Sequence, residues 1–172
     1  MMSTVTKREF TGYLRNFVFG VEDSLVSTVG LLSGIAAAGV ARNTILLTGM
    51  VLIFVEAFSM AVGSYLSENT AEEYMADGAM ASNRSSLISA VIMFVSYFIS
   101  GLIPIFPYMF LGSATAFPIS IALACLSLFT LGMVSGKILK INIWKNALKM
   151  FVMGGIAIAI GVLVGKWLKT VI

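Results

Sequence analysis

Five long apolar runs, separated by shorter polar or charged stretches, organise the chain. They extend roughly over residues 17–40, 44–66, 87–105, 117–134 and 147–164. Each is close to the roughly 20 residues that a helix needs to cross the hydrocarbon core of a bilayer. The pattern predicts an all-α integral membrane protein with five transmembrane helices, forming a single domain over residues 1–172.

The connections between the runs differ in composition. Residues 42–43 mark a very short turn, and residues 67–86 form a polar segment that lacks proline and could continue the preceding helix. Between the third and fourth runs, we expect an uncharged loop bracketed by Pro104, Pro107 and Pro118. A stretch rich in lysine joins the fourth run to the fifth.

Composition supports the membrane interpretation and excludes several classes of protein. Hydrophobic residues make up 59% of the chain and charged residues only 11%, whereas soluble domains carry roughly 25% charged residues. Histidine is absent and Cys125 is the single cysteine, which argues against a disulfide framework and against zinc sites of the His or Cys kind. There is no nucleophile–base pair or cofactor motif and no basic patch with interleaved aromatics, so we expect no enzyme, no cofactor and no nucleic-acid binding.

The distribution of basic residues predicts the orientation in the membrane. Five spans place the two termini on opposite sides. A cytoplasmic N-terminus assigns eight basic residues to the cytoplasm and only three to the other side, as the positive-inside rule favours. The cytoplasmic set is Lys7, Arg8, Arg15, Arg84, Lys137, Lys140, Lys145 and Lys149, and the opposite set is Arg42, Lys166 and Lys169.

Three acidic residues lie inside the predicted spans, the adjacent Glu22 and Asp23 in the first and Glu56 in the second. The Glu22 side chain points about 100° away from that of Asp23, so it has an interfacial or structural interpretation as well as a functional one. A carboxylate near the bilayer centre costs at least ~2.5 kcal/mol on insertion scales. No Lys or Arg is expected at matching depth, so a proton or a bound cation remains as the compensating charge. With two carboxyls at similar depth, at least one should hold a proton when no metal is bound.

Depth estimates place a further side chain, that of Met60, close to the depth of these carboxyl groups. At ~1.5 Å per residue, Asp23 lies ~9 Å from the cytoplasmic start of the first span and Met60 lies ~8 Å from the cytoplasmic end of the second. Glu56 should lie one turn deeper than Met60 and on the same helix face. Met60 alone would also suit simple packing, but two carboxylates with a thioether suit a borderline divalent transition metal.

The polar segment after the second run carries further acids, with Glu68 and Glu72 spaced by four residues and Glu73 and Asp77 spaced likewise. Two interpretations stay open here. The acids can form a solvated helix face, or they can form a surface that collects or senses metal, which would relieve the repulsion between like charges four residues apart.

Glycines spaced by four residues occur in three of the runs, and such pairs allow helices to approach closely in lipid. They can serve packing within one chain or contact between two chains. We expect a two-fold dimer with the first span near the axis, assisted by the first pair. The pairs are Gly30 and Gly34, Gly132 and Gly136, and Gly161 and Gly165.

Two stretches of the sequence resemble the vacuolar iron transporter (VIT) family. Residues 20–24, Gly-Val-Glu-Asp-Ser, are similar to the G-x-x-D-G opening span of that family. Residues 56–67 are similar to its second span, which ends in S-M-x-x-G-x-Y-L-S. The five-span plan with a charged segment after the second span also matches.

The resemblance implies a homodimer that moves ferrous iron, often also manganese, out of the cytosol, with proton exchange in some members. It implies a pathway through Asp23, a second-span Glu and Met60. Some relatives place the second-span acid where this chain has Leu52, whereas Glu56 lies one turn nearer Met60. Ser24 stands where the family usually has Gly.

The cytoplasmic segment is shorter than the metal-binding domain of the plant-type members. Glu68, Glu72 and Glu73 remain where its first helix would begin. The leading hypothesis is therefore an iron(II) or manganese(II) transporter that binds metal through Asp23 and Met60 with Glu56, together with these three glutamates. The alternatives are a membrane scaffold that binds a partner through the acidic segment, and a pathway for protons or monovalent cations.

Overall fold

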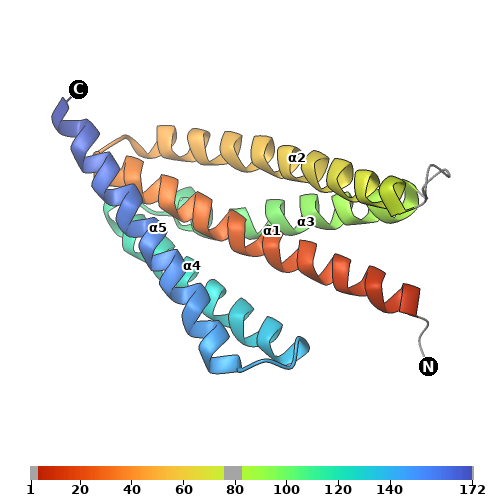
Figure 1. The fold of residues 1–172 in the computed structure, drawn as a ribbon. Helices are drawn as coiled ribbons and strands as arrows, with labels where there is room; N and C mark the ends of the chain where they lie inside the picture. The colour runs from red at the N-terminus through yellow and green to blue at the C-terminus, as the bar shows by residue number, and fades with distance from the viewer. Residues whose placement is uncertain (1–3, 76–82, 172) are drawn as a thin grey trace.

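The computed structural model describes residues 4–75 and 83–171 of the chain, and it is built from five long helices. They are α1 (Thr4–Ala37), α2 (Arg42–Met75), α3 (Asn83–Phe110), α4 (Ser113–Ile138) and α5 (Ile143–Val171). Successive helices run in opposite directions, so that α1 begins at one end of the molecule and α5 finishes at the other (Figure 1). All five are long and apolar enough to cross a membrane, which confirms the predicted all-α, five-span architecture.

The helices are longer than the apolar runs that predicted them. The second helix continues to Met75, so the polar segment begins as helix, as the absence of proline indicated. Asp77, which belongs to the same segment, lies outside the described residues.

The prediction of a proline-bracketed loop between the third and fourth spans is wrong. Pro104 and Pro107 lie inside α3 and Pro118 lies inside α4, so the connection shrinks to residues 111–112. Proline is tolerated in membrane helices when neighbouring groups satisfy the backbone. Arg42 caps the end of α3, where its guanidinium donates hydrogen bonds to the carbonyl groups of Tyr108 and Met109.

Glycine pairs join α1 to α5 within one chain. A Cβ atom placed on Gly34 would lie 2.7 Å from the carbonyl oxygen of Gly161, and a Cβ on Gly161 or Gly165 would collide with the carbonyl oxygens of Gly30 or Gly34. Only glycine allows the two backbones to approach so closely. The expectation that Gly30 and Gly34 assist a dimer contact is therefore wrong, because the fold uses both of them internally.

Large apolar side chains remain exposed on the outer helices. Phe58 of α2 is 65% exposed and Leu163 of α5 is 68% exposed. Hydrophobic surface of this extent is compatible with a lipid environment. The buried core lies between the helices, with Tyr108 and Ile53 in one cluster and Leu25 and Leu128 in another.

Candidate ion pathway along α1, α2 and α3

Two sets of hydrogen bonds fix the antiparallel register between α1 and α2. Near the start of α1, the Asn16 amide donates to Ser64 Oγ at 3.2 Å and to Glu68 Oε1 at 3.0 Å, both in α2. Farther along, Ser27 of α1 and Glu56 of α2 contact the same hydroxyl group, that of Tyr97.

The stretch between these two points contains Asp23 on α1 and Met60 on α2. The antiparallel register places them at about the same depth, with Glu56 one helical turn farther along. This arrangement agrees with the depth estimate made from the sequence. All three side chains are half-buried.

Tyr97 of α3 joins the three helices and is fully buried. Its hydroxyl group donates to Glu56 Oε2 and lies 2.7 Å from Ser27 Oγ. The Ser24 hydroxyl donates to the Tyr97 carbonyl oxygen at 2.6 Å. Sequence reasoning missed Tyr97, although a tyrosine between serines in an apolar run is a signal, because a buried phenol needs a hydrogen-bond partner.

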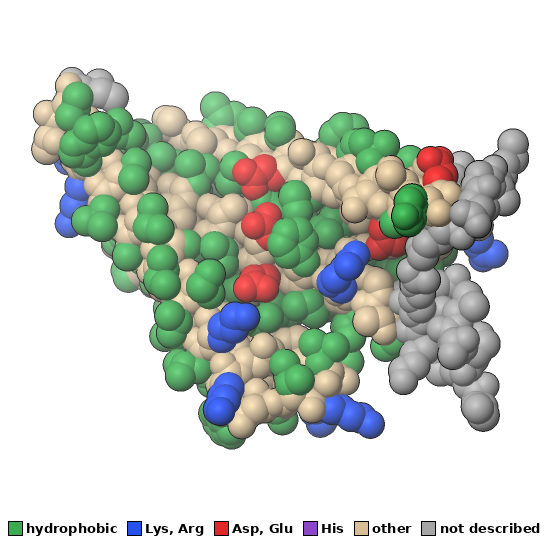
Figure 2. Space-filling model, in the orientation of Figure 1, with side chains coloured by type: hydrophobic (Ala, Val, Ile, Leu, Met, Phe, Trp, Pro, Cys, Tyr) green, Lys and Arg blue, Asp and Glu red, His purple; other side chains and the backbone are tan. Residues whose placement is uncertain are grey.

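The carboxyl groups lie close enough to one another for their charges to interact. Asp23 interacts with Glu56 and also with its neighbour Glu22. Figure 2 shows acidic side chains in a row that crosses α2 and α1 near the middle of the molecule, open to the face in view. The acids of two helices thus form one electrostatic group.

One basic side chain reaches this group, contrary to the expectation from the sequence. Lys149 of α5 interacts with the charge of Glu22, because the packing of α5 against α1 brings its early turns to this depth. The expectation that no Lys or Arg lies at matching depth is therefore wrong, because Glu22 is adjacent to Asp23 on α1. Within the described residues, none of the carboxyl groups of Glu22, Asp23 and Glu56 has a Lys or Arg nitrogen within 4.0 Å.

The serine that replaces the usual glycine after Asp23 is accommodated by a glycine opposite. Ser24 is fully buried, and a Cβ atom placed on Gly101 of α3 would lie 2.7 Å from its hydroxyl oxygen. The missing side chain at Gly101 leaves the space that Ser24 occupies. The substitution therefore brings the hydroxyl that holds the Tyr97 backbone.

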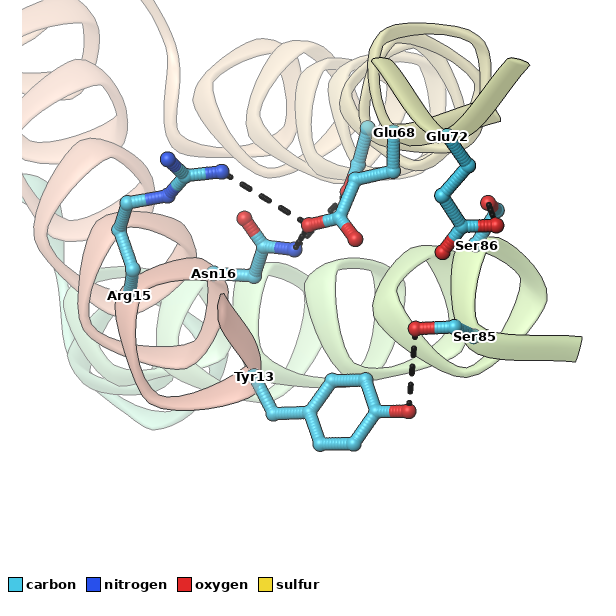
Figure 3. A network of polar contacts seen from close by, with 8 residues as sticks. Tyr13, Arg15, Asn16, Glu68, Glu72, Ser85 and Ser86 are labelled. Carbon is cyan, nitrogen blue, oxygen red and sulfur yellow. Dashed lines mark hydrogen bonds and ion pairs between the residues drawn. The ribbon is translucent and has the colours of Figure 1, made fainter. Parts of the chain in front are cut away.

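The acids that follow Met60 on α2 lie in a separate network near the beginning of α1 (Figure 3). Glu68 accepts the hydrogen bond from Asn16 and lies 3.7 Å from the Arg15 guanidinium. Glu72 accepts a hydrogen bond of 3.3 Å from Ser86 of α3. These two acids therefore tie α2 to its neighbours.

Glu73 is exposed and accepts a hydrogen bond from Asn69 of its own helix at 2.7 Å. Among the described residues, no group of three or more His, Cys, Asp or Glu side chains is placed to hold a metal ion. The six predicted ligands therefore divide into a deep set, Asp23, Glu56 and Met60, and a set near the start of α1, Glu68, Glu72 and Glu73.

Comparison with protein families identifies a match over most of the chain. The model described as the VIT family matches residues 14–81 and 70–166, which takes in both sets of predicted ligands and Tyr97. No curated protein matches the chain.

Proposed function

Since the chain belongs to the VIT family, a family of metal-ion transporters rather than enzymes, we propose that it carries iron(II) or manganese(II) out of the cytosol in exchange for protons. The observation that supports this most directly is that Asp23 and Glu56, on two neighbouring membrane helices, lie near enough for their charges to interact. Met60, level with Asp23, adds a sulfur ligand to this pair.

The argument from charge favours a divalent cation. Two carboxylates in a membrane bundle repel each other, and a proton on one of them relieves the repulsion. A divalent metal compensates both charges at once and displaces that proton, so metal binding and proton release are linked. The thioether favours iron(II) or manganese(II) over calcium and magnesium, which prefer all-oxygen ligands.

We further propose a homodimer that covers this face. The acidic row is open on the surface in view (Figure 2), and carboxylates at such a depth are costly against lipid. A second copy packed on the α1–α2 face would enclose them and could complete the coordination of the metal. Mass measurement in mild detergent tests this assembly, and a monomer that still transports would contradict it.

In the proposed orientation, with the N-terminus in the cytoplasm, the Glu68 end of the pathway faces the metal first. Glu68, Glu72 and Glu73 would collect metal before it moves to Met60 and Asp23. The scaffold hypothesis receives less support, because Glu68 and Glu72 are engaged with α1 and α3 and only Glu73 is exposed among the three.

Reconstituted vesicles test the function directly. The purified chain is placed in liposomes that contain a metal indicator and a pH indicator, and iron(II) or manganese(II) is added outside. We expect metal to enter and the interior to become more alkaline as protons leave, with neither change in empty vesicles. Metal uptake without alkalinisation would remove proton exchange from the proposal, and absence of uptake with both metals would contradict the transport function.

A further inference from the structure

The turn between α4 and α5 and the two helix ends beside it carry three lysines that have no acidic neighbour. Lys137, Lys140 and Lys145, here called the α4–α5 lysine patch, are all exposed. Every acidic residue of the sequence lies at or before position 77, and within the described residues none of the three lysines forms an ion pair. Figure 2 shows basic and no acidic side chains at this end of the α4–α5 hairpin.

Lys149 lies one turn after Lys145 on α5 but does not belong to the patch, because its charge interacts with Glu22. The three patch lysines are therefore free to meet a partner outside the chain. Their net charge requires that partner to be anionic.

Large apolar side chains are interleaved with the patch lysines. Ile138 is 47% exposed, Ile141 is 49% exposed and Trp144 is 71% exposed. At the end of two membrane helices, such residues lie at the boundary between acyl chains and headgroups, where tryptophan is enriched and lysine extends its ammonium group towards water. The mixture fits a lipid headgroup layer better than a soluble anion.

The backbone holds the patch in a defined conformation. Hydrogen bonds from the Ile141 amide to the Gly136 carbonyl, at 3.0 Å, and from the Lys140 amide to the Lys137 carbonyl, at 3.4 Å, close the end of α4. The Asn142 side chain accepts a hydrogen bond of 3.0 Å from the Lys145 amide and caps the start of α5. The lysines are thus presented on a fixed turn.

Lys140 occupies a backbone position that favours glycine. Its φ angle is 55°, in the left-handed region where a side chain is strained and where helices commonly end with glycine. A lysine at this position weakens the turn relative to glycine. Its presence is explained if the side chain has a use beyond the turn.

We propose that the α4–α5 lysine patch binds the headgroup phosphates of anionic phospholipids in the adjoining leaflet of the membrane. The charge selects an anionic headgroup, and the interleaved Ile141 and Trp144 contact the upper acyl region. This interaction is independent of the Asp23–Glu56 site and does not require that the chain transports metal.

The two tryptophans of the chain, Trp144 and Trp167, provide a local test. A Trp167→Phe variant, in which Trp144 is the sole tryptophan, is reconstituted in vesicles containing brominated phosphatidylglycerol or brominated phosphatidylcholine. We expect the anionic lipid to be preferred around Trp144 by at least about threefold. A single lysine near an anionic surface already contributes roughly fivefold. The preference should decrease as salt is raised.

Lys140→Gly separates the lipid interaction from folding. It removes the charge and also relieves the left-handed strain, so the melting temperature should stay the same or rise. Combined with Lys137→Gln and Lys145→Gln, it should bring the preference at Trp144 close to one. In the matched Trp144→Phe chain, which reports from Trp167 beside Lys166 and Lys169 at the other end of α5, the same three substitutions should change nothing.

Either of two results would overturn the proposal. Equal quenching of Trp144 by the two lipids would overturn the proposal. An anionic preference that persists in the folded Lys137→Gln, Lys140→Gly, Lys145→Gln chain would also overturn it, because the charge would then come from elsewhere.

Discussion

At the scale of single residues, the candidate pathway depends on two carboxyl groups that the membrane interior disfavours. Asp23→Asn and Glu56→Gln each keep the shape of the side chain and remove its charge. We expect each to lower the initial rate of metal uptake in vesicles by at least about tenfold, since a neutral amide cannot compensate a divalent cation. The apparent metal affinity of the unchanged protein should also fall between about pH 8 and pH 5.5, because protons compete for the same oxygens.

The control for both variants is their insertion and their size in detergent, which should not change. If both variants transport at the normal rate, or if the metal affinity is the same across this pH range, the carboxyl groups are structural and the transport mechanism proposed for them is wrong.

Met60 tests the contribution of sulfur. Met60→Leu keeps most of the volume and removes the thioether, so uptake of iron(II) and manganese(II) should weaken while the melting temperature changes little. Met153→Leu on α5, where the side chain is 49% exposed, is the matched control and should have no effect. Normal uptake by Met60→Leu would assign Met60 to packing.

Tyr97 tests the positioning of Glu56. Tyr97→Phe removes the hydroxyl that Glu56 and Ser27 share, so both lose a partner. We expect a loss of about 1–3 kcal/mol in the free energy of unfolding, together with a higher metal concentration for half-maximal uptake.

Tyr108→Phe is the matched control for Tyr97→Phe. The Tyr108 hydroxyl is buried and has no hydrogen-bond partner within the residues that the structure describes, so its removal should be neutral or stabilising. Equal effects of the two substitutions on stability and on uptake would show that Tyr97 has no special relation to Glu56.

At the scale of helices, the contact between α1 and α5 depends on glycines, whose lack of a Cβ atom lets the two backbones touch. Gly161→Ala would push a Cβ atom into the Gly30 carbonyl oxygen, and overpacking of this kind typically costs about 1–3 kcal/mol. Gly155→Ala, on the same helix with no heavy atom within 4 Å of its Cβ position, should be neutral. Thermal unfolding in detergent measures both, and equal melting temperatures would contradict the close packing.

The end of α3 shows that proline in the sequence does not by itself predict where a membrane helix ends. The prolines near the end of α3 were expected to mark a loop, but they lie within the helix and Arg42 caps its final carbonyl groups. Proline rules describe an isolated helix in water. In a membrane bundle, a helix can continue through proline when neighbouring groups stabilise it, and a side chain distant in sequence can cap its end.

At the scale of the whole molecule, the orientation is open to a labelling test. In a Cys125→Ser background, Tyr74→Cys at the end of α2 and Thr115→Cys at the start of α4 introduce thiols at exposed positions that the proposed topology places on opposite sides. A membrane-impermeant maleimide added to sealed cells should label Thr115→Cys and spare Tyr74→Cys. Labelling of both from the same side would contradict the topology.

The sequence by itself determined the five spans, the all-α class and the depth of the acidic residues. These properties depend on distance along the chain: hydropathy identifies the spans, and a constant helical rise converts residue number into depth. The level placement of Asp23 and Met60, with Glu56 a turn beyond, follows from that count alone.

The tertiary structure decided which helix faces meet. It assigned the Gly30 and Gly34 pair to α5 rather than to a dimer, brought Lys149 to Glu22, and placed the Tyr97 hydroxyl between Glu56 and Ser27. Rotation of a helix about its axis changes all these contacts without changing any depth. It is set by the packing of all five helices together, because in lipid close contact rather than hydrophobicity drives their association.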